Sequence, residues 1–204
     1  MLIWLVLIPL IAAALIGLCK APARPTALLS ASLTLALGIW ALVSFDGCSS
    51  CWSRFEGMDL QLTLAPALSK VMLLLTILVT FATVLGTNPP QGGEASWYNS
   101  ALLISAGATG AFLSDNIISF FAFHELALIP TFVMIGLYGR GDRRTTAWRA
   151  TLYLGLASMV LLAALLMIGT QAGFTFSGLK DFMASGRELA QAELIGALLI
   201  AGFG

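Results

Sequence analysis

The stretch that decides the fold is NIISFFAFHELALIPTFVMIGLY, residues 116–138. At a rise of about 1.5 Å per residue, a helix of this length crosses the roughly 30 Å of hydrocarbon in a bilayer. Its one formally charged side chain is Glu125, which lies nine residues after Asn116 and thirteen before Tyr138. The stretch therefore predicts a transmembrane helix with a carboxylate close to the bilayer midplane.

The rest of the chain has the composition of a membrane protein. Of its 204 residues, 59% are hydrophobic and 10% are charged, and the mean hydropathy is +0.95. Ordinary globular proteins carry about a quarter charged residues. Ten basic residues balance ten acidic ones, so no net charge attracts nucleic acid. These figures exclude a soluble enzyme, a nucleic-acid binder and a disordered tail.

Apolar runs divide the chain into six complete spans and part of a seventh, without a soluble domain. Each span is expected to be helical, because backbone groups in lipid need partners within their own segment. The expected fold class is an all-α, polytopic transmembrane helical bundle. The last segment allows only about 22 Å of helix, so we expect the natural protein to continue past Gly204. The predicted spans are residues 2–18, 26–45, 66–86, 97–113, 116–138, 147–169 and the incomplete 190–204.

The distribution of basic residues predicts the orientation of the bundle. Cytoplasmic loops are enriched in Lys and Arg. The first, third and fifth connections hold six of these residues and the others hold four, which predicts an N-terminus outside the cytoplasm. In the sixth connection, residues 171–190, apolar residues recur at helical spacing among charges and favour a short helix at the membrane interface. The six basic residues of the first, third and fifth connections are Lys20, Arg24, Arg140, Arg143, Arg144 and Arg149. The four basic residues of the other connections are Arg54, Lys70, Lys180 and Arg187.

Two short motifs carry weaker signals. Cys48 and Cys51 fall in the second connection, on the predicted outer side, where they form either a small-loop disulfide or two free thiols. A zinc site is less favoured, because one Cys-x-x-Cys lacks the four ligands of structural zinc. The small residues of Gly107-Ala108-Thr109-Gly110 lack the Lys of a phosphate-binding loop and favour close helix packing.

Glu125 is the candidate functional residue. A carboxylate at the bilayer centre costs at least about 2.5 kcal/mol on insertion scales. Such a residue either stays protonated and hydrogen-bonds a neighbouring helix, or it takes part in an ion pathway. The adjacent His124 either packs against its neighbours or relays protons to Glu125 through water. Pro130 removes a hydrogen bond near Leu126 and predicts a kink one turn beyond the carboxylate.

This region resembles the fifth-helix signature of the antiporter-like subunits of respiratory complex I, most closely the subunit M (chain 4) family. The resemblance rests on FFAFHELALIP at residues 120–130 and IGLYG at 135–139, and it continues into AWRATLY at 147–153. It is specific from about Tyr98 to Met167. The family usually has Trp where this chain has His124, and Lys where this chain has Arg149. Arg149 keeps the positive charge at its position, but its guanidinium does not release a proton as the ammonium group of Lys can.

The resemblance implies a proton-translocating membrane subunit of an NADH:quinone oxidoreductase in a bacterial cytoplasmic (inner) membrane. In such subunits the fifth-helix Glu, here Glu125, pairs with a Lys on a broken seventh helix that this chain does not reach. Quinone (ubiquinone) is reduced elsewhere in the complex and drives the proton transfer. The resemblance also implies that flavin, iron–sulfur clusters and the NADH site belong to other subunits, and that this chain binds no cofactor or metal. The expected partners are other membrane subunits and the lipid bilayer, not nucleic acid.

Two other functions stay open. Multisubunit Na⁺/H⁺ antiporters and membrane-bound hydrogenases use homologous subunits with the same fifth-helix motif. A further alternative is a truncated accessory chain that contributes helices to a membrane assembly without transporting ions.

Overall fold

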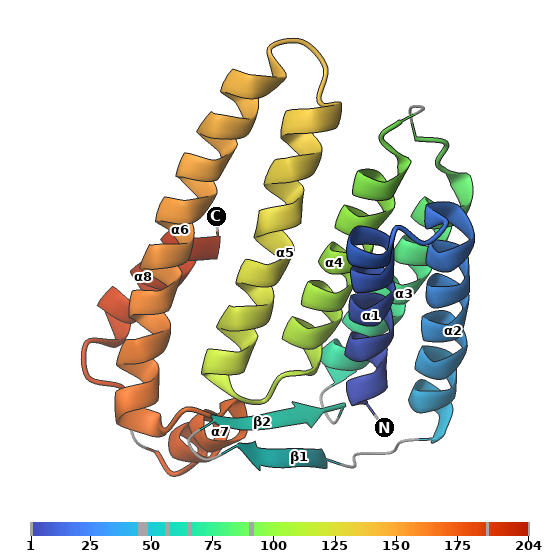
Figure 1. Cartoon of the computed structure of the whole chain (residues 1–204). Coiled ribbons are helices and arrows are strands. Elements are labelled where there is room, and N and C mark those ends of the chain that lie inside the picture. Colours follow the sequence, from blue (N-terminus) through green and yellow to red (C-terminus); the bar gives the residue numbers. More distant parts are fainter. Residues whose placement is uncertain are drawn as a thin grey trace.

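The computed structural model describes residues 2–44, 49–55, 58–64, 67–89, 92–186 and 188–203. Six long helices run alternately up and down, and the connections α1–α2, α3–α4 and α5–α6 lie at one end of the bundle (Figure 1). Two strands and two shorter helices complete the described part. The elements are α1 (Ile3–Cys19), α2 (Ala23–Ser44), β1 (Ser49–Phe55), β2 (Met58–Thr63), α3 (Ala67–Gly86), α4 (Glu94–Leu113), α5 (Ile117–Tyr138), α6 (Arg143–Ala172), α7 (Phe176–Ala184) and α8 (Ala192–Phe203).

The predicted helical bundle is confirmed in part. Four helices, α2, α3, α5 and α6, are long and apolar enough to cross a membrane. Helix α1 is apolar but has 17 residues. Helix α4 has 20 residues, but polar side chains such as Glu94 and Asn99 lower its hydropathy. Six full spans and an N-terminus outside the cytoplasm therefore remain predictions.

Helix α6 begins earlier than its apolar run indicates. The prediction placed its start at residue 147, whereas the helix begins at Arg143. The cause is a polar cap: Asp142 Oδ1 accepts a hydrogen bond from the backbone N–H of Thr145 at 3.4 Å. Side-chain caps satisfy the free N–H groups of the first turn, so they extend helices into polar sequence.

An antiparallel hairpin of β1 and β2 occupies the second connection, where we expected a loop. Ser49 pairs with Thr63 and Phe55 with Met58, and the register shifts between Cys51 and Arg54. Leu62 forms a bridge with Ser114 in the α4–α5 turn, which holds the hairpin against the end of the bundle (Figure 1). Cys48 lies outside the described residues, so the disulfide with Cys51 stays a prediction.

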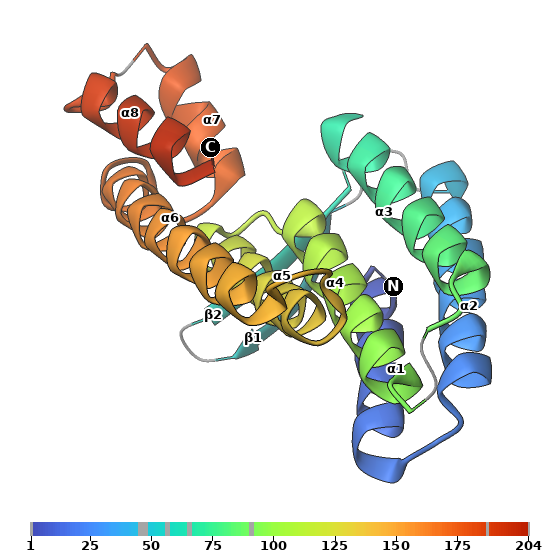
Figure 2. The ribbon, with the colours of Figure 1, turned by 90° about the horizontal axis from the view of Figure 1, so that it is seen from above.

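Helix α4 lies at the centre of the bundle. Figure 2 shows it between the group of α1, α2 and α3 and the pair α5–α6, with α7 and α8 on the far side of α6. Buried α4 residues, including Tyr98, Leu102 and Leu113, take part in two apolar clusters with α1, α2 and α3. A third cluster joins α5, α6 and α8 through Ile117, Leu161 and Ile195.

The connection after α6 folds back onto the start of α5. It contains α7, the short helix expected there. The Asp115 carboxylate accepts hydrogen bonds from Ser177 N at 3.1 Å and from Ser177 Oγ at 2.6 Å. The backbone N–H of Ile117 donates to Phe174 O at 2.9 Å. The connection after α6 is thereby joined to the beginning of α5 by direct hydrogen bonds.

Candidate functional site

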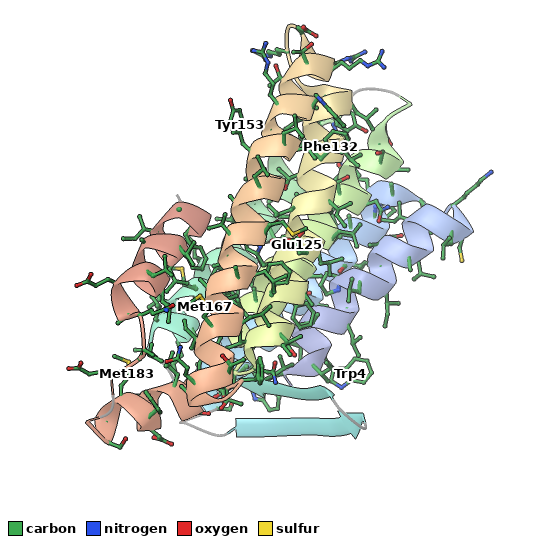
Figure 3. The ribbon with its side chains drawn as sticks, turned by 90° about the vertical axis from the view of Figure 1, so that its left-hand side faces the viewer. Trp4, Glu125, Phe132, Tyr153, Met167 and Met183 are labelled. Atoms are coloured by element: carbon green, nitrogen blue, oxygen red, sulfur yellow. The ribbon has the colours of Figure 1, made fainter. Side chains whose placement is uncertain are left out.

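The site is built on the middle of α5. The helix starts at a polar cap, because Asn116 Oδ1 accepts hydrogen bonds from Ile118 N at 2.8 Å and Ser119 N at 3.3 Å. Glu125 follows eight residues after Ile117, about 12 Å along the helix. Figure 3 shows it near mid-length, with Phe132 closer to the α5–α6 loop. Glu125 thus lies near the middle of α5, and its depth in a bilayer stays a prediction.

Glu125 and His124 approach each other at this depth. His124 Nδ1 lies 3.7 Å from Glu125 Oε1, and the two side chains are 28% and 37% exposed. Both atoms are buried, and neither has a hydrogen-bond partner within the described residues. A buried acceptor or donor without a partner is costly, and these two atoms are therefore the unsatisfied polar groups at the middle of α5.

Helix α4 fixes the turn of α5 that carries the pair. A Cβ at Gly107 would lie 2.8 Å from Ala127 N and 2.8 Å from Phe123 O, so only glycine permits this approach. A Cβ at Gly110 would overlap the Phe123 ring. The close packing predicted for this small-residue motif is confirmed. Because Phe123 faces α4, the next two residues are turned away from it by about 100° and 200°.

His124 faces a cavity of about 450 Å³ between α5, α6 and α8. Tyr153 and Ser158 of α6 also line this cavity. The His124 ring is flanked by Phe120 and Phe121, with ring centroids at 6.3 Å and 6.4 Å. His124 therefore borders both Glu125 Oε1 and a cavity that two hydroxyl-bearing residues line.

The remaining predicted site residues are not brought to Glu125. Arg149 is exposed on α6, and within the described ranges it forms no ion pair with Glu125. Pro130 is buried inside α5, which continues through it to Tyr138. The kink at Pro130 stays a prediction, and so do the roles of Arg149 and Glu125.

Sequence reasoning missed a group of hydroxyls between α3 and α4. Thr80 Oγ1 lies 2.9 Å from Ser105 Oγ and donates to Thr76 O at 2.7 Å. Thr76, Thr80 and Ser105 line a cavity of about 360 Å³ that Met134 of α5 also reaches. Thr109, one turn from Ser105, is fully buried, and its hydroxyl has no partner in the described part of the chain. Hydroxyls in apolar helices have no distinctive spacing, so only the three-dimensional packing reveals the group.

Comparison with known proteins finds a family that is similar to this part of the chain. Residues 114–204, which include Glu125 and the cavity beside it, match the transmembrane family described as NADH:quinone oxidoreductase/Mrp antiporter. Residues 114–204 are thus similar to the transmembrane domain of this family. The predicted resemblance to the antiporter-like subunits is confirmed.

Curated relatives of this family include complex I-type subunits. The F(420)H(2) dehydrogenase subunit M of Methanosarcina mazei is 25% identical over 168 residues, covering 78% of this chain and 34% of that protein. The NADH-quinone oxidoreductase subunit M of Rickettsia typhi is 27% identical over 150 residues, covering 70% of this chain and 30% of that protein. The chain thus spans about a third of the length of these relatives.

Solved structures of three kinds of membrane complex share the fold. A chain of the archaeal membrane-bound sulfane sulfur reductase matches with a TM-score of 0.83 and 18% identity, over 98% of this chain and 43% of that one. A chain of Thermus thermophilus respiratory complex I gives 0.80 and 24%, over 100% and 42%. A chain of the Mrp complex from Dietzia sp. DQ12-45-1b gives 0.78 and 20%, over 98% and 23%. All three are chains of multisubunit membrane assemblies.

Proposed function

We propose that this chain is part of a proton-translocating membrane subunit of an NADH:quinone oxidoreductase, and that Glu125 carries the proton within the membrane. The observation that carries the proposal is a carboxylate at mid-length of an apolar helix with its Oε1 buried and unbonded among the described residues. Because such a position is costly for a charge, a carboxylate is retained there when it exchanges a proton or an ion partner.

His124 is the proposed neighbour in this proton path. A neutral imidazole accepts a proton at one ring nitrogen and releases one from the other. Its Nδ1 is 3.7 Å from Glu125 Oε1, and the residue lines the cavity that Tyr153 and Ser158 share. A proton therefore passes between the cavity and the carboxylate through His124, with water completing the gaps between hydrogen-bonding groups.

Arg149 has a weaker place in this mechanism. It is the sixth-helix cation that stands where the family usually has Lys, and its guanidinium holds its charge permanently. Since Arg149 is exposed and forms no ion pair with Glu125 in the described part of the chain, its proposed effect is electrostatic and acts at a distance. The seventh-helix Lys implied by the resemblance is not among the residues of this chain that match the motif.

The energy for transfer comes from other subunits in this proposal. NADH oxidation, flavin, iron–sulfur clusters and quinone reduction reside there, and neighbouring membrane subunits transmit the coupling to α5. The membrane is the bacterial cytoplasmic membrane. This assignment rests on relatives such as the NADH-quinone oxidoreductase subunit M of Rickettsia typhi.

A subunit of a multisubunit Na⁺/H⁺ antiporter is the second candidate. It is favoured by the description of the matching family, which names the Mrp antiporter, and by the fold shared with a chain of the Mrp complex at a TM-score of 0.78. The two functions differ in their energy source. Proton movement that requires NADH and quinone supports the first, whereas movement driven by a Na⁺ gradient without NADH supports the second.

The test is Glu125→Gln in the complete complex, measured as NADH-driven acidification of proteoliposomes together with quinone reductase rate. The amide keeps the shape of the side chain but cannot exchange a proton, so we expect proton transfer through this subunit to be lost. Glu94→Gln is the matched control, because Glu94 is an exposed residue in the first turn of α4. Normal pumping and normal quinone reduction in Glu125→Gln would refute the role of Glu125.

A further inference from the structure

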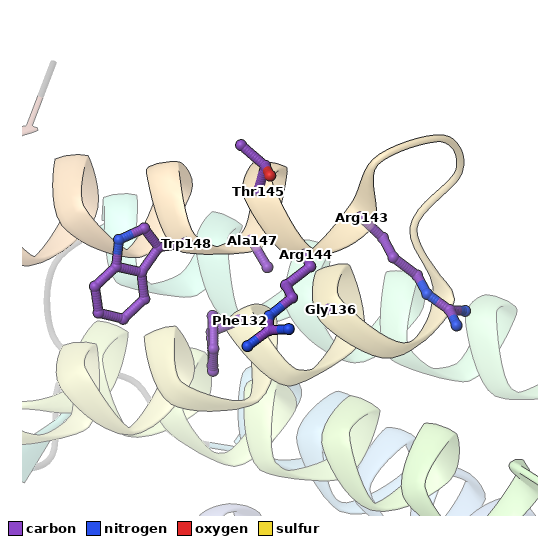
Figure 4. A pocket seen from close by; sticks show the side chains of 7 residues that line it. All are labelled: Phe132, Gly136, Arg143, Arg144, Thr145, Ala147 and Trp148. Atoms are coloured by element: carbon purple, nitrogen blue, oxygen red, sulfur yellow. The ribbon is translucent and has the colours of Figure 1, made fainter.

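A basic groove separates α5 from α6 at the end of the bundle where their connecting loop lies. Its volume is about 710 Å³, and residues of α5 and of the first two turns of α6 line it. Figure 4 shows Phe132 and Gly136 on one side and Arg144 and Trp148 on the other. The groove is separate from the His124 cavity, which lies further along the same two helices.

The walls of this groove are apolar and accessible. Phe132 is 39% exposed and Trp148 is 61% exposed. Between them the helices come close, because a Cβ at Gly136 would lie 3.6 Å from Ala147 Cβ. The groove is therefore a channel along the helices with two aromatic walls and small residues at its base.

Two arginines border the groove, and their side chains extend in different directions, Arg144 toward Phe132 and Arg143 toward the loop (Figure 4). Arg143 Nη1 donates a hydrogen bond to Leu137 O at 3.0 Å, which holds this side chain across the α5–α6 junction. The Arg144 guanidinium extends toward α5, beside Phe132 and Gly136 (Figure 4). Over the ranges that the structure describes, no carboxylate forms an ion pair with either arginine. The nearby Asp142 uses its carboxylate to cap α6.

Along the groove, a charged side chain is followed by an aromatic one, just as the charged head group of a phospholipid is followed by its apolar chains. Arg144 lies in the first turn of α6, and Trp148 follows one turn, about 6 Å, further toward the membrane interior. Tryptophan is enriched at the membrane interface, where one side is polar and the other apolar. Arginine binds phosphate oxygens through two parallel hydrogen bonds. Basic pockets between transmembrane helices are suited to anionic head groups.

We propose that the groove binds one anionic phospholipid, with its phosphate on Arg144 and an acyl chain along Phe132 and Trp148. Arg144, which forms no ion pair in the described ranges, accounts for the negative charge of the ligand, and Arg143 adds positive charge nearby. The aromatic walls account for its chain, which a free phosphate ion lacks. This binding site is independent of proton transfer at Glu125.

The test measures lipid binding to the protein purified in non-ionic detergent. Native mass spectrometry follows retention of phosphatidylglycerol, with phosphatidylcholine as the neutral lipid and inorganic phosphate as the free anion. We expect Arg144→Gln to lower phosphatidylglycerol retention about fivefold, the effect of one basic residue near an anionic lipid. Arg144→Lys should restore part of the retention. Phosphatidylglycerol, and not phosphate, should raise the thermal stability of the unaltered protein.

Arg140→Gln is the matched control, because Arg140 is exposed in the same loop region but does not line the groove. We expect it to change retention less than twofold. Equal losses in Arg140→Gln and Arg144→Gln would overturn the proposal in favour of general electrostatic attraction. Equal retention of the two lipids, or equal stabilisation by phosphate, would also overturn it. So would a photo-crosslinker at position 148 that captures a neighbouring subunit in the complete complex and no lipid.

Discussion

The two faces of α5 differ in how closely they are packed. On the face toward α4, Gly107 allows the backbones of α4 and α5 to come very close together. A Cβ added at Gly107 would lie only 2.8 Å from Ala127 N. Toward α6, the corresponding approach at Gly136 leaves 3.6 Å to Ala147 Cβ, and cavities of about 710 and 450 Å³ lie along the interface. The closely packed face fixes the position of α5, and the proposed proton path and lipid site both lie on the open face.

The largest expected effect comes from breaking the closely packed face with Gly107→Ala. The new methyl group would meet the backbone of α5, which cannot move aside as a flexible side chain can. Overpacking typically costs about 1–3 kcal/mol. We expect the temperature of thermal unfolding in detergent to fall by several degrees and the proton-pumping rate to fall with it.

Gly155→Ala provides the control for this change. Gly155 lies in α6, and an added Cβ would have nothing within 4 Å. The same substitution there should leave the unfolding temperature unchanged or slightly raised, since alanine favours helix. Equal destabilisation by both variants would show that the α4–α5 interface is not specially close.

An intermediate effect is expected from His124→Trp, which changes the open face. Tryptophan is the commoner residue of the family at this position, and it cannot accept and release a proton. If His124 relays protons, the pumping rate should fall roughly tenfold or more, because positioned proton-transfer groups contribute at least that much. The measurement is acidification of proteoliposomes at equal amounts of assembled complex. Unchanged pumping would show that His124 only packs against its neighbours, and it would not affect the role proposed for Glu125.

The smallest effect is expected from Thr80→Val, which removes a hydrogen bond between α3 and α4, on the side of α4 away from the His124 cavity. Thr80 Oγ1 lies 2.9 Å from Ser105 Oγ, and hydrogen bonds between transmembrane helices average about 0.6 kcal/mol. The unfolding temperature should fall by a degree or two. Thr83→Val is the control, because Thr83 lines the same cavity but its hydroxyl donates no hydrogen bond in the described residues. Equal shifts of the unfolding temperature in both variants would show that the loss of a hydroxyl group, and not of the hydrogen bond to Ser105, causes the effect.

Long apolar helices were the most predictable part of the fold. Residues 116–138 correspond to α5 almost residue for residue, because Asn116 caps its start and the polar loop from Gly139 ends it. The hairpin of β1 and β2 was missed although the sequence carries a signal for it. Leu60, Leu62 and Leu64 alternate with polar residues after Gly57. Such alternation is typical of a strand, but it is short beside the long apolar runs on either side.

The place of the candidate site along α5 was predictable from the sequence, and its contacts were not. The position of Glu125 follows from counting residues along α5. Its approach to His124 does not follow, because neighbours on a helix diverge by about 100° and only the side-chain rotamers bring them to 3.7 Å. Arg149 shares a predicted role with these residues, yet it is exposed on α6. Sequence similarity identifies a helix position and says little about which atoms meet there.

The hydrogen bonds at the two ends of α5 have a mechanical consequence. One end is joined to the segment after α6 through Ile117 N and Phe174 O, at 2.9 Å. The other is joined to the start of α4 through Tyr138 Oη and Gly93 O, at 2.5 Å. A helix that is held at both ends cannot slide or rotate freely, so a force at its centre bends it. A charge change at Glu125 would then alter the curvature of α5, and Pro130, which removes one stiffening bond, lies where that bending is easiest.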